Sequence, residues 1–482
     1  MRTLLQVLAE DERDKVHEQT LKLLSQTGMR VDTSWGRRIL RAAGADVSES
    51  THIVRFPPAL VKASLQAAPR KFTLGGRRPN WNLTLNEGEC TLLADGGAVF
   101  VLDPQTAKPR PGAFDDWLAA TRLIDALDDI GIYWWMVKGG LAGDSMGDAV
   151  AYWRNVFGNF SKHVQDATYT PEQSRWMLEV LQAIFGDKET IRRLHPMSFL
   201  LCPLSPLVIE ESYTDAYLEV VTAGYDVPVA VMPMPLMGAT SPGSLISTIV
   251  LGNCEALAVL CLVEAAAPGT PFIYAPALAV MEPRSGRYGS GAVEHALLGA
   301  AATEMARYYD LPAEASTGGT DHRVPGIQAS YERAINWTLP TLAWPDILVG
   351  PGLLGGSMIL CLEQLMIDVE VFGRCKQLHR GVQSDEGRWL EDVIASVGPS
   401  GDFVSQRSTR DAVHTGEWHI SQLGVHDAFE KWEAAGKQDL LQEAREKVAR
   451  ILATHQPLPL EKAVERELSR IERRARESAS RG

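Results

Sequence analysis

The chain has 482 residues, of which 45% are hydrophobic and 22% charged, a composition typical of soluble globular proteins. Its 47 lysine and arginine residues and 60 aspartate and glutamate residues give a formal net charge of −13. An acidic chain of this kind is not expected to use nucleic acid as its main partner. Six cysteines without a C-x-x-C pair, and a first segment without a long apolar stretch, indicate reduced thiols in a cytoplasmic protein.

Residues 1–88 are expected to form an N-terminal cap region of short helices and strands. Helical spacing of apolar residues covers Asp11–Gln26 and Ser34–Ala43, and the two segments stop at Gly28 and Gly44. A third helix is expected over Ala59–Ala68, because proline residues stand at both of its ends.

From about residue 89 the chain changes to short apolar runs rich in β-forming residues. Eight such runs predict strands of a buried sheet. They are Thr91–Ala94, Gly131–Val137, Lys162–Gln165, Ser198–Cys202, Val227–Met232, Pro271–Ala275, Pro312–Thr317 and Asp346–Gly350.

Segments with helical spacing alternate with these runs. They are Phe114–Leu127, Ser145–Phe157, Pro171–Ile184, Glu211–Ala223, Ser244–Ala266, Ala292–Tyr309, Gln328–Leu342 and Leu362–Phe372. Eight strands that alternate with eight helices predict a TIM-like (β/α)8 barrel over residues 89–382, in the α/β class. An open doubly wound sheet is the alternative, and the regular series of similar units favours closure.

Two other segments bear on the organisation of the chain. The apolar stretch from Leu245 to Ala267 contains Asn253, Glu255 and Glu264, so we expect a buried helix and not a membrane span. Residues 383–482 become polar and helical and end in a highly charged tail. The tail is interpreted as a solvated helix that frays, with a partner-docking arm as the alternative.

In a barrel of this type, function lies in the loops that follow the carboxyl ends of the strands. The seventh predicted strand is followed by two glycines and then by Asp321, His322 and Arg323. Three ionisable residues at a barrel mouth are candidates for catalytic residues, and a loop salt bridge is the alternative.

Aromatic residues give a second set of candidates. Trp134 and Trp135 are adjacent on the second predicted strand, so one should face the barrel interior and the other the helices. Either could form a wall for a quaternary ammonium ion, as could Tyr274 on the sixth strand, although core packing explains all three equally well. His163 on the third strand is a further candidate for substrate binding.

Glycines at two strand ends are the candidates for close approach of a cofactor: Gly318, Gly319, Gly350 and Gly352. The segment Gly350–Gly355 matches G-x-G-x-x-G, but a helix follows it, so a tight turn at the barrel mouth is favoured over a dinucleotide site. The eleven histidines are scattered and predict no metal site.

With these motifs the chain resembles the corrinoid-dependent trimethylamine methyltransferase family, in particular its members without pyrrolysine. The likeness extends over nearly the whole chain. The residues that carry it, in the family's order, are Val99–Asp103, Arg110-Pro111, Cys202–Leu207, Pro233–Pro242, Asn253–Ala258, Pro268–Pro271, Thr320-Asp321, Pro325, Gln328-Ala329, Glu363–Asp368 and Trp432–Gly436.

The resemblance implies a barrel that passes a methyl group from a methylated amine to a cognate corrinoid protein, with no cofactor held tightly by the chain itself. In members that use trimethylamine, pyrrolysine follows the Thr-Asp pair, and here Arg323 or His322 takes that place. Characterised relatives without pyrrolysine use quaternary amines, so a substrate similar to glycine betaine is implied. Arg323 or His322 would bind its carboxylate, Gln328 belongs to the same motif, and a homo-oligomer is expected.

Two other functions are compatible with the same residues. One is a methyltransferase with the same donor pocket and a folate or other methyl acceptor. The other is a barrel that binds methylammonium compounds without catalysis.

Overall fold

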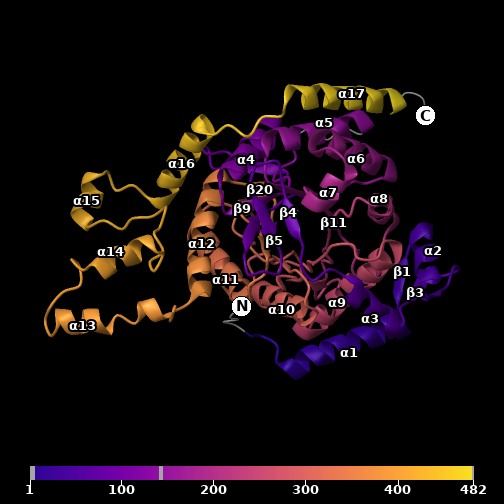
Figure 1. The fold of residues 1–482 in the computed structure, drawn as a ribbon, viewed down its shortest axis with the longest axis horizontal. Coiled ribbons are helices and arrows are strands. Elements are labelled where there is room, and N and C mark those ends of the chain that lie inside the picture. The colour runs from indigo at the N-terminus through magenta and orange to yellow at the C-terminus, as the bar shows by residue number, and fades with distance from the viewer. Residues whose placement is uncertain (1–5, 140–144, 480–482) are drawn as a thin grey trace.

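A closed ring of eight parallel strands forms the centre of the structure, a computed structural model that describes residues 6–139 and 145–479 (Figure 1). The order around the ring is β15-β13-β11-β10-β9-β6-β18-β17. A bridge between Tyr274 and Ala313 closes it, where the Tyr274 amide donates to the Pro312 carbonyl at 2.9 Å. The strands are β6 (Thr91–Leu93), β9 (Ile130–Tyr133), β10 (His163–Asp166), β11 (Met197–Leu201), β13 (Val229–Val231), β15 (Phe272–Tyr274), β17 (Glu314–Ser316) and β18 (Ile347–Val349).

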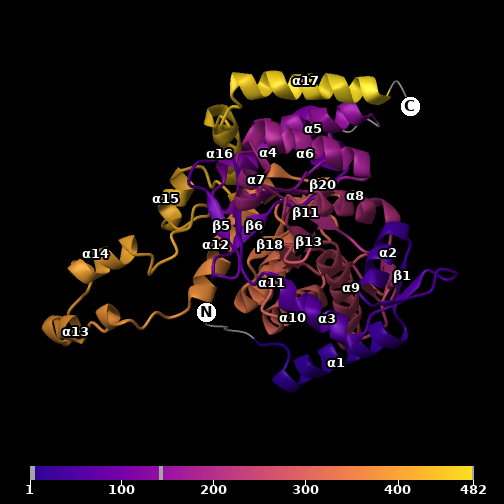
Figure 2. The ribbon, with the colours of Figure 1, turned by 45° about the vertical axis from the view of Figure 1, so that its right-hand side comes forward.

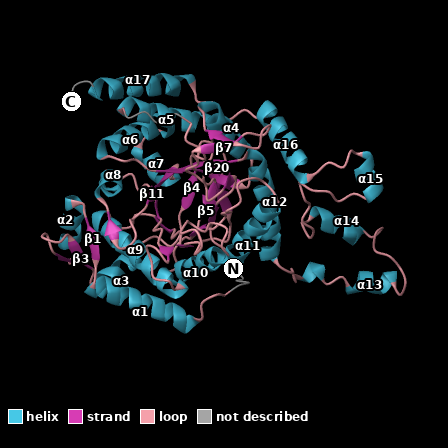
Figure 3. Cartoon of the chain, turned by 180° about the vertical axis from the view of Figure 1, so that it is seen from behind, coloured by secondary structure: helices cyan, strands magenta, loops and turns pink. Residues whose placement is uncertain are grey.

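Helices surround the ring on its outer side, and Figure 3 shows them in cyan around the magenta strands. They are α4 (Phe114–Ala126), α5 (Met146–Asn159), α6 (Pro171–Phe185), α7 (Lys188–Leu194), α8 (Glu211–Thr222), α9 (Leu245–Ala266), α10 (Val293–Tyr308), α11 (Ile327–Ala343) and α12 (Leu362–Arg380). The predicted (β/α)8 barrel is confirmed, and all eight predicted strands overlap those of the ring.

Alternation along each strand separates two hydrophobic cores. Inward residues such as Leu93, Leu200 and Ile273 form the interior core, and their neighbours pack outward against the helices. Helix α9 is long and apolar enough to cross a membrane by length and composition alone, but 89% of its most apolar window is buried in the protein. It is therefore a core helix, as its polar interruptions predict.

A β-hairpin closes one end of the barrel. Strands β4 (Thr73–Gly75) and β5 (Asn82–Thr84) contribute Leu74 and Leu83 to the interior core. The Gly75 amide donates to the carbonyl of His195, just before β11 begins, so the hairpin covers the amino-terminal ends of the strands. Access to the interior is therefore from the carboxyl-terminal ends, which we call the mouth.

Four short strands form a small sheet of their own. They are β7 (Phe100–Leu102), β8 (Pro109–Pro111), β19 (Leu353–Leu354) and β20 (Ile359–Leu360), and β14 (Leu236–Met237) pairs with β16 (Ala279–Val280) elsewhere. β7 and β8 follow β6, while β19 and β20 follow β18. Since β6 and β18 are neighbours in the ring, this sheet joins two loops that leave adjacent strands.

The N-terminal segment packs on the outside of the barrel. It contains α1 (Glu10–Gln26), α2 (Ser34–Ala42), α3 (Pro58–Ala67), β1 (Met29–Val31), β2 (Asp46–Val47) and β3 (Ile53–Arg55). All three helices contact α9, and β1 pairs with β12 (Val208–Ile209). The segment thus covers the helix layer and not the mouth.

The C-terminal segment leaves the barrel and returns to it. The 3₁₀ turn η1 (Glu386–Arg388), α13 (Glu391–Val397), α14 (Arg407–His414) and α15 (Phe429–Ala434) project away from the barrel, as Figure 2 shows. Trp389, Ile394 and Val404 on this arm are 65%, 62% and 86% exposed. Helix α16 (Leu440–Thr454) then packs against α12 and α4. How the chain divides into domains at residues 88 and 382 stays a prediction.

Helix α17 (Lys462–Ala479) lies along α5 and α6, so the prediction of a solvated, fraying tail is wrong for the described part of the tail, which ends at residue 479 (Figure 1). Leu468, Ile471 and Ala475 are buried in the contact. They lie three, four and seven residues apart, which places them on one helix face. Charged residues of α17, which suggested a solvated helix, form ion pairs at the edge of this contact, such as Arg476 with Asp148 at 2.9 Å.

We predict that Leu468→Ala will increase amide hydrogen exchange over residues 462–479. Removing the buried side chain leaves a cavity that costs about 2–5 kcal/mol. This cost destabilises the packing of α17 against α5 and α6. Arg466→Ala, an exposed position on the same helix, is the control and should leave exchange unchanged. Exchange that is already fast in the unmodified protein would show that α17 is not docked.

Candidate active site at the barrel mouth

A hydrogen bond crosses the interior of the barrel. The Gln165 amide on β10 donates from Nε2 to Oε2 of Glu314 on β17 at 2.8 Å. The two strands are four positions apart in a ring of eight, so they face each other from opposite walls. Gln165 is fully buried and Glu314 is 2% exposed. The pair forms a polar floor inside an otherwise apolar barrel.

The floor has two acceptor oxygens that the described residues leave without a hydrogen-bond partner, Oε1 of Gln165 and Oε1 of Glu314. Buried polar atoms normally have partners, because leaving one unpaired costs free energy. Burial raises the pKa of Glu314 to about 7, although the bond from Gln165 acts in the opposite direction. A ligand that carries positive charge would satisfy both oxygens and favour the ionised carboxylate.

Three side chains at inward positions line the interior toward the mouth. Trp134, Cys202 and Ser316 come after or at the carboxyl ends of their strands and are partly exposed, so they can be reached from outside. Trp134 lies against Gly96, where a Cβ atom would come within 1.5 Å of its indole ring. Only glycine at position 96 allows the indole to occupy this place in the mouth.

The two tryptophans follow the expected alternation, although β9 ends at Tyr133 and both lie beyond it. Trp134 packs with the interior core, whereas Trp135 packs with the outer core. Their rings are nearly parallel, with centroids 6.3 Å apart and an interplanar angle of 26°. Trp134 is therefore the aromatic surface of the interior site.

Cys202 is a thiol close to the floor of the site. Burial and the nearby Glu314 carboxylate raise the pKa of this thiol to about 12. A thiol with such a pKa stays protonated at neutral pH, and the protonated form is a poor nucleophile.

The predicted loop residues lie together at the mouth, but they differ in whether their polar groups already have partners within the protein. Asp321 accepts a hydrogen bond from the Ser290 amide at 3.0 Å, and burial raises its pKa. His322 bonds through Nδ1 to the Val324 carbonyl at 2.6 Å. Arg323 is exposed and has no ion pair among the described residues, so its charge is available to a ligand.

Glu332 holds this loop in place from helix α11. Its carboxylate accepts from Thr320 Oγ1 at 2.5 Å and from the Asp321 amide at 3.0 Å. Gln328, predicted to bind substrate, donates Nε2 to the same carboxylate at 2.8 Å. Gln328 therefore supports the loop through Glu332, and a direct role in binding stays a prediction.

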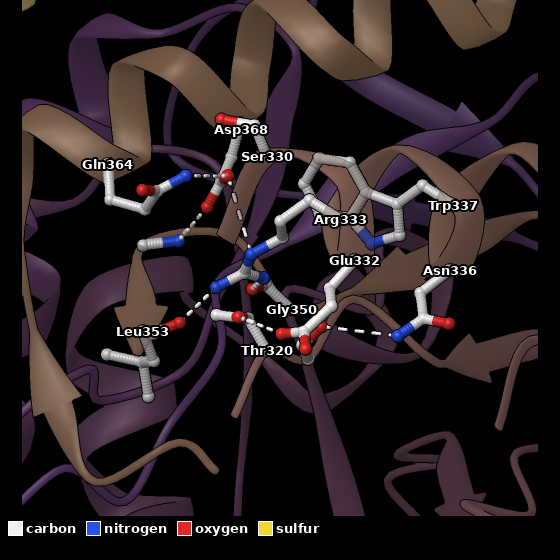
Figure 4. A network of polar contacts seen from close by, with 12 residues as sticks. Thr320, Ser330, Glu332, Arg333, Asn336, Trp337, Gly350, Leu353, Gln364 and Asp368 are labelled. Carbon is white, nitrogen blue, oxygen red and sulfur yellow. Dashed lines mark hydrogen bonds and ion pairs between the residues drawn. The ribbon is translucent and has the colours of Figure 1, made fainter. Parts of the chain in front are cut away.

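A buried ion pair holds the neighbouring loop, as Figure 4 shows. Arg333 is fully buried, and its guanidinium donates to the carbonyls of Gly350 and Leu353. Its Nε lies 3.4 Å from Asp368, which also accepts from the Gly352 amide at 2.7 Å. The loop after β18 is thus fixed by a charged pair with further hydrogen bonds on both partners.

The four glycines predicted to approach a cofactor are buried, and each packs closely against other residues of the protein. Gly350 and Gly352 have φ angles of +129° and +90°, which side chains rarely adopt. A Cβ atom on Gly350 would lie 2.5 Å from the Cα atom of Gly318, and one on Gly319 would meet Ser290. Close packing of two mouth loops explains these glycines, and contact with a cofactor stays a prediction.

Two of the residues predicted to bind substrate do not line the interior toward the mouth. Tyr274 is 2% exposed in the outer core and donates to Asn253 Oδ1 at 2.9 Å, since Ile273 is the residue of β15 that points inward. His163 does point inward, but it lies at the closed end, where its ring bonds to Gly75 of the hairpin and to Ser198. Burial lowers its pKa to about 3, so this histidine is neutral.

Sequence reasoning missed Gln165 and Glu314, the residues of the floor. Both stand in correctly predicted strands, and the signal was a polar residue within an apolar barrel strand. The described residues contain no group of three or more His, Cys, Asp or Glu side chains placed to hold a metal ion.

The family model and the relatives found by sequence indicate one family. A family model described as trimethylamine methyltransferase matches residues 2–479. A trimethylamine methyltransferase of Methanosarcina barkeri is 30% identical over 473 residues, which cover 97% of this chain and 94% of that protein. A glycine betaine methyltransferase of Desulfitobacterium hafniense (strain Y51) is 28% identical over 468 residues, covering 96% and 95% of the two chains.

Among solved structures, the monomethylamine methyltransferase of Methanosarcina barkeri aligns with a TM-score of 0.48 and 10% sequence identity. The alignment covers 97% of this chain and 92% of that one.

Proposed function

The chain belongs to the trimethylamine methyltransferase family, and from this we propose that it transfers a methyl group from a quaternary, betaine-like amine to the Co(I) corrinoid of a partner protein. Methyl transfer from a methylated amine is the activity that the family and its named relatives share. The substrate and the acceptor are our proposals. The observation that carries them is the polar floor beneath Trp134, with two unpartnered buried oxygens.

The floor fits the positive charge of a methylated nitrogen. Oε1 of Glu314 and Oε1 of Gln165 would face the cation, and the indole of Trp134 would lie against its methyl groups. A cation over an aromatic face gains roughly 0.5–2 kcal/mol, with the larger value in a site that excludes water. Both oxygens are buried in the interior core, so the charge interaction is weakly screened by solvent.

The reaction requires the protein mainly to position the substrate and to exclude water from it. The C–N bond breaks, its electron pair stays on nitrogen, and the amine leaves as a neutral tertiary amine without proton transfer. Co(I) of the corrinoid supplies the nucleophile that takes the methyl group. The chain has to hold the C–N bond in line with the mouth and exclude water, which are positioning and desolvation effects.

Two features of the mouth fit a corrinoid acceptor brought from outside. Trp134, Cys202 and Ser316 are partly exposed, so a partner docked at the mouth would reach the substrate above the floor. The raised pKa of Cys202 keeps this thiol protonated, so it would not compete for the methyl group. These features support our proposal that the partner is a corrinoid protein that docks on the mouth.

Sequence identity does not choose between trimethylamine and glycine betaine, because relatives named for each are 30% and 28% identical. Arg323 favours the betaine. It is an exposed guanidinium beside the mouth, and its planar fork can bind a carboxylate with two hydrogen bonds. His322 is the alternative, but its ring is already bonded to Val324.

We also propose a cytoplasmic homo-oligomer. The six cysteines are free thiols, as in proteins of a reducing compartment. The projecting arm from η1 to α15 exposes apolar side chains, including Trp389 and Val404, that association could cover.

Incubation with Co(I) cobalamin and a panel of amines tests the reaction. We expect glycine betaine to convert the visible spectrum to that of methylcobalamin, and we expect trimethylamine to give no conversion. A methylated folate formed in place of methylcobalamin would show that the acceptor is wrong. Betaine binding in calorimetry without any methyl transfer would show that the barrel binds but does not catalyse.

Glu314→Gln should weaken binding of glycine betaine about 10-fold to 100-fold, because the amide keeps the shape and loses the charge. In the unmodified protein the affinity should rise from about pH 6 to about pH 8, since the cation binds the ionised carboxylate and the pKa of Glu314 is raised to about 7. In the variant this pH dependence should disappear. Calorimetry at several pH values measures both effects.

Glu264→Gln is the matched control for this variant. Glu264 also has a pKa raised by burial to about 7 and an unpartnered Oε1, but it lies on α9, outside the ring of strands. Its replacement should leave binding and its pH dependence unchanged. Equal effects of the two variants would contradict the assignment of the floor.

Arg323→Ala should weaken glycine betaine binding about 10-fold or more, the value of a charge-assisted hydrogen bond. Binding of tetramethylammonium, which has no carboxylate, should not change. The comparison of the two ligands by calorimetry isolates the carboxylate contact from any effect on folding. Unchanged betaine binding would exclude this role for Arg323.

A further inference from the structure

A second cavity, of about 470 Å³, lies beside the mouth but outside the ring of strands. It is bounded by residues 135–139 after β9, by the loop that follows β10 and by helices α4, α5 and α6. None of its described lining residues belongs to the interior core. We call this cavity the side pocket.

Five aromatic side chains contribute to its wall. Trp117 and Trp153 are almost fully buried behind it, while Trp135, Tyr152 and Tyr169 are partly exposed at its surface. They come from a helix, two strand-end loops and a second helix, so rings bound the space from several directions. Tyr152 and Trp153 meet edge to face, with centroids 4.9 Å apart.

The side pocket also holds a buried carboxylate. Asp166, the last residue of β10, is 4% exposed. It accepts hydrogen bonds from the Tyr152 hydroxyl and, at 2.7 Å, from the Ala167 amide, but it makes no ion pair among the described residues. Asp148 is the other acidic group of the wall, and it is paired with Arg476 at 2.9 Å. Lys138 stands exposed at the rim.

Aromatic faces around a carboxylate without a cationic partner are the chemistry that recognises organic cations. We propose that the side pocket is a second binding site, which takes a small methylated ammonium compound between Trp135, Tyr152 and Tyr169 with Asp166 as its counter-charge. The site is separate from the floor formed by Gln165 and Glu314, and it does not depend on methyl transfer at that floor.

The stacked rings of Trp134 and Trp135 lie between the two sites. Trp135 lines the side pocket, and Trp134, stacked on it, lines the interior. A cation in the side pocket therefore lies next to the mouth, and the stacked pair forms the partition between the two sites.

Crystals soaked with arsenobetaine test the proposal, because anomalous scattering locates arsenic directly. We expect one arsenic atom within the aromatic wall near Asp166 and a second above Glu314. In Glu314→Gln crystals the first should remain while the second is lost. Arsenic above Glu314 with none in the side pocket at the same concentration would overturn the second site, and arsenic in the side pocket alone would overturn only the interior site.

Calorimetry with tetramethylammonium gives an independent measure. Trp135→Leu should weaken one of two binding events about 2-fold to 30-fold, the range expected for one aromatic face. Trp389→Leu, on the exposed arm, is the control for loss of a tryptophan and should change neither event. A single binding event in the unmodified protein, or two events unaffected by Trp135→Leu, would contradict the proposal.

Discussion

The hydrogen bond from Gln165 to Glu314 is the interaction on which the rest of the site depends. It joins opposite walls of the barrel, and it uses one oxygen of the carboxylate while leaving the other free. A carboxylate held in this way has a fixed position but an unsatisfied charge. The closed ring of strands brings these two side chains together across its interior, although they are separated by about 150 residues of sequence and by half the circumference of the barrel.

The loops of the mouth are held by separate buried groups, each with nearly full use of its polar atoms. Glu332 accepts hydrogen bonds from Thr320 and Asp321 of the loop after β17, and Gln328 of its own helix donates to the same carboxylate. Arg333 and Asp368 fix the loop after β18, and each makes hydrogen bonds beyond the ion pair. A buried pair repays its desolvation only with such additional bonds. Since Glu332 and Arg333 are adjacent on α11, a single helix sets the positions of both loops relative to the floor.

Periodicity in the sequence was sufficient to predict the eight strands, the helices and the closed barrel. It could not predict which strands face each other, so Gln165 and Glu314 remained unnoticed in strands that were correctly assigned. Tyr274 was misplaced because the choice between inward and outward depends on the register of each strand, which short runs do not fix. The spacing of Leu468, Ile471 and Ala475 could have predicted that α17 packs on the barrel. The many charged residues of this helix instead favoured the prediction of a solvated tail.

In the proposed reaction, the burial of Glu314 also distinguishes a bound cation from a neutral product. Burial disfavours the charged carboxylate, so its pKa lies near neutrality and not near that of a carboxylate in water. A quaternary nitrogen compensates for this burial and favours the ionised form. In the proposed reaction, loss of a methyl group removes the permanent charge from nitrogen, so the buried carboxylate loses the counter-charge that compensated for its burial. The proposed interaction with a permanent positive charge is therefore weakened in the same step that forms the product, and a floor of two permanently neutral acceptors would provide no such difference.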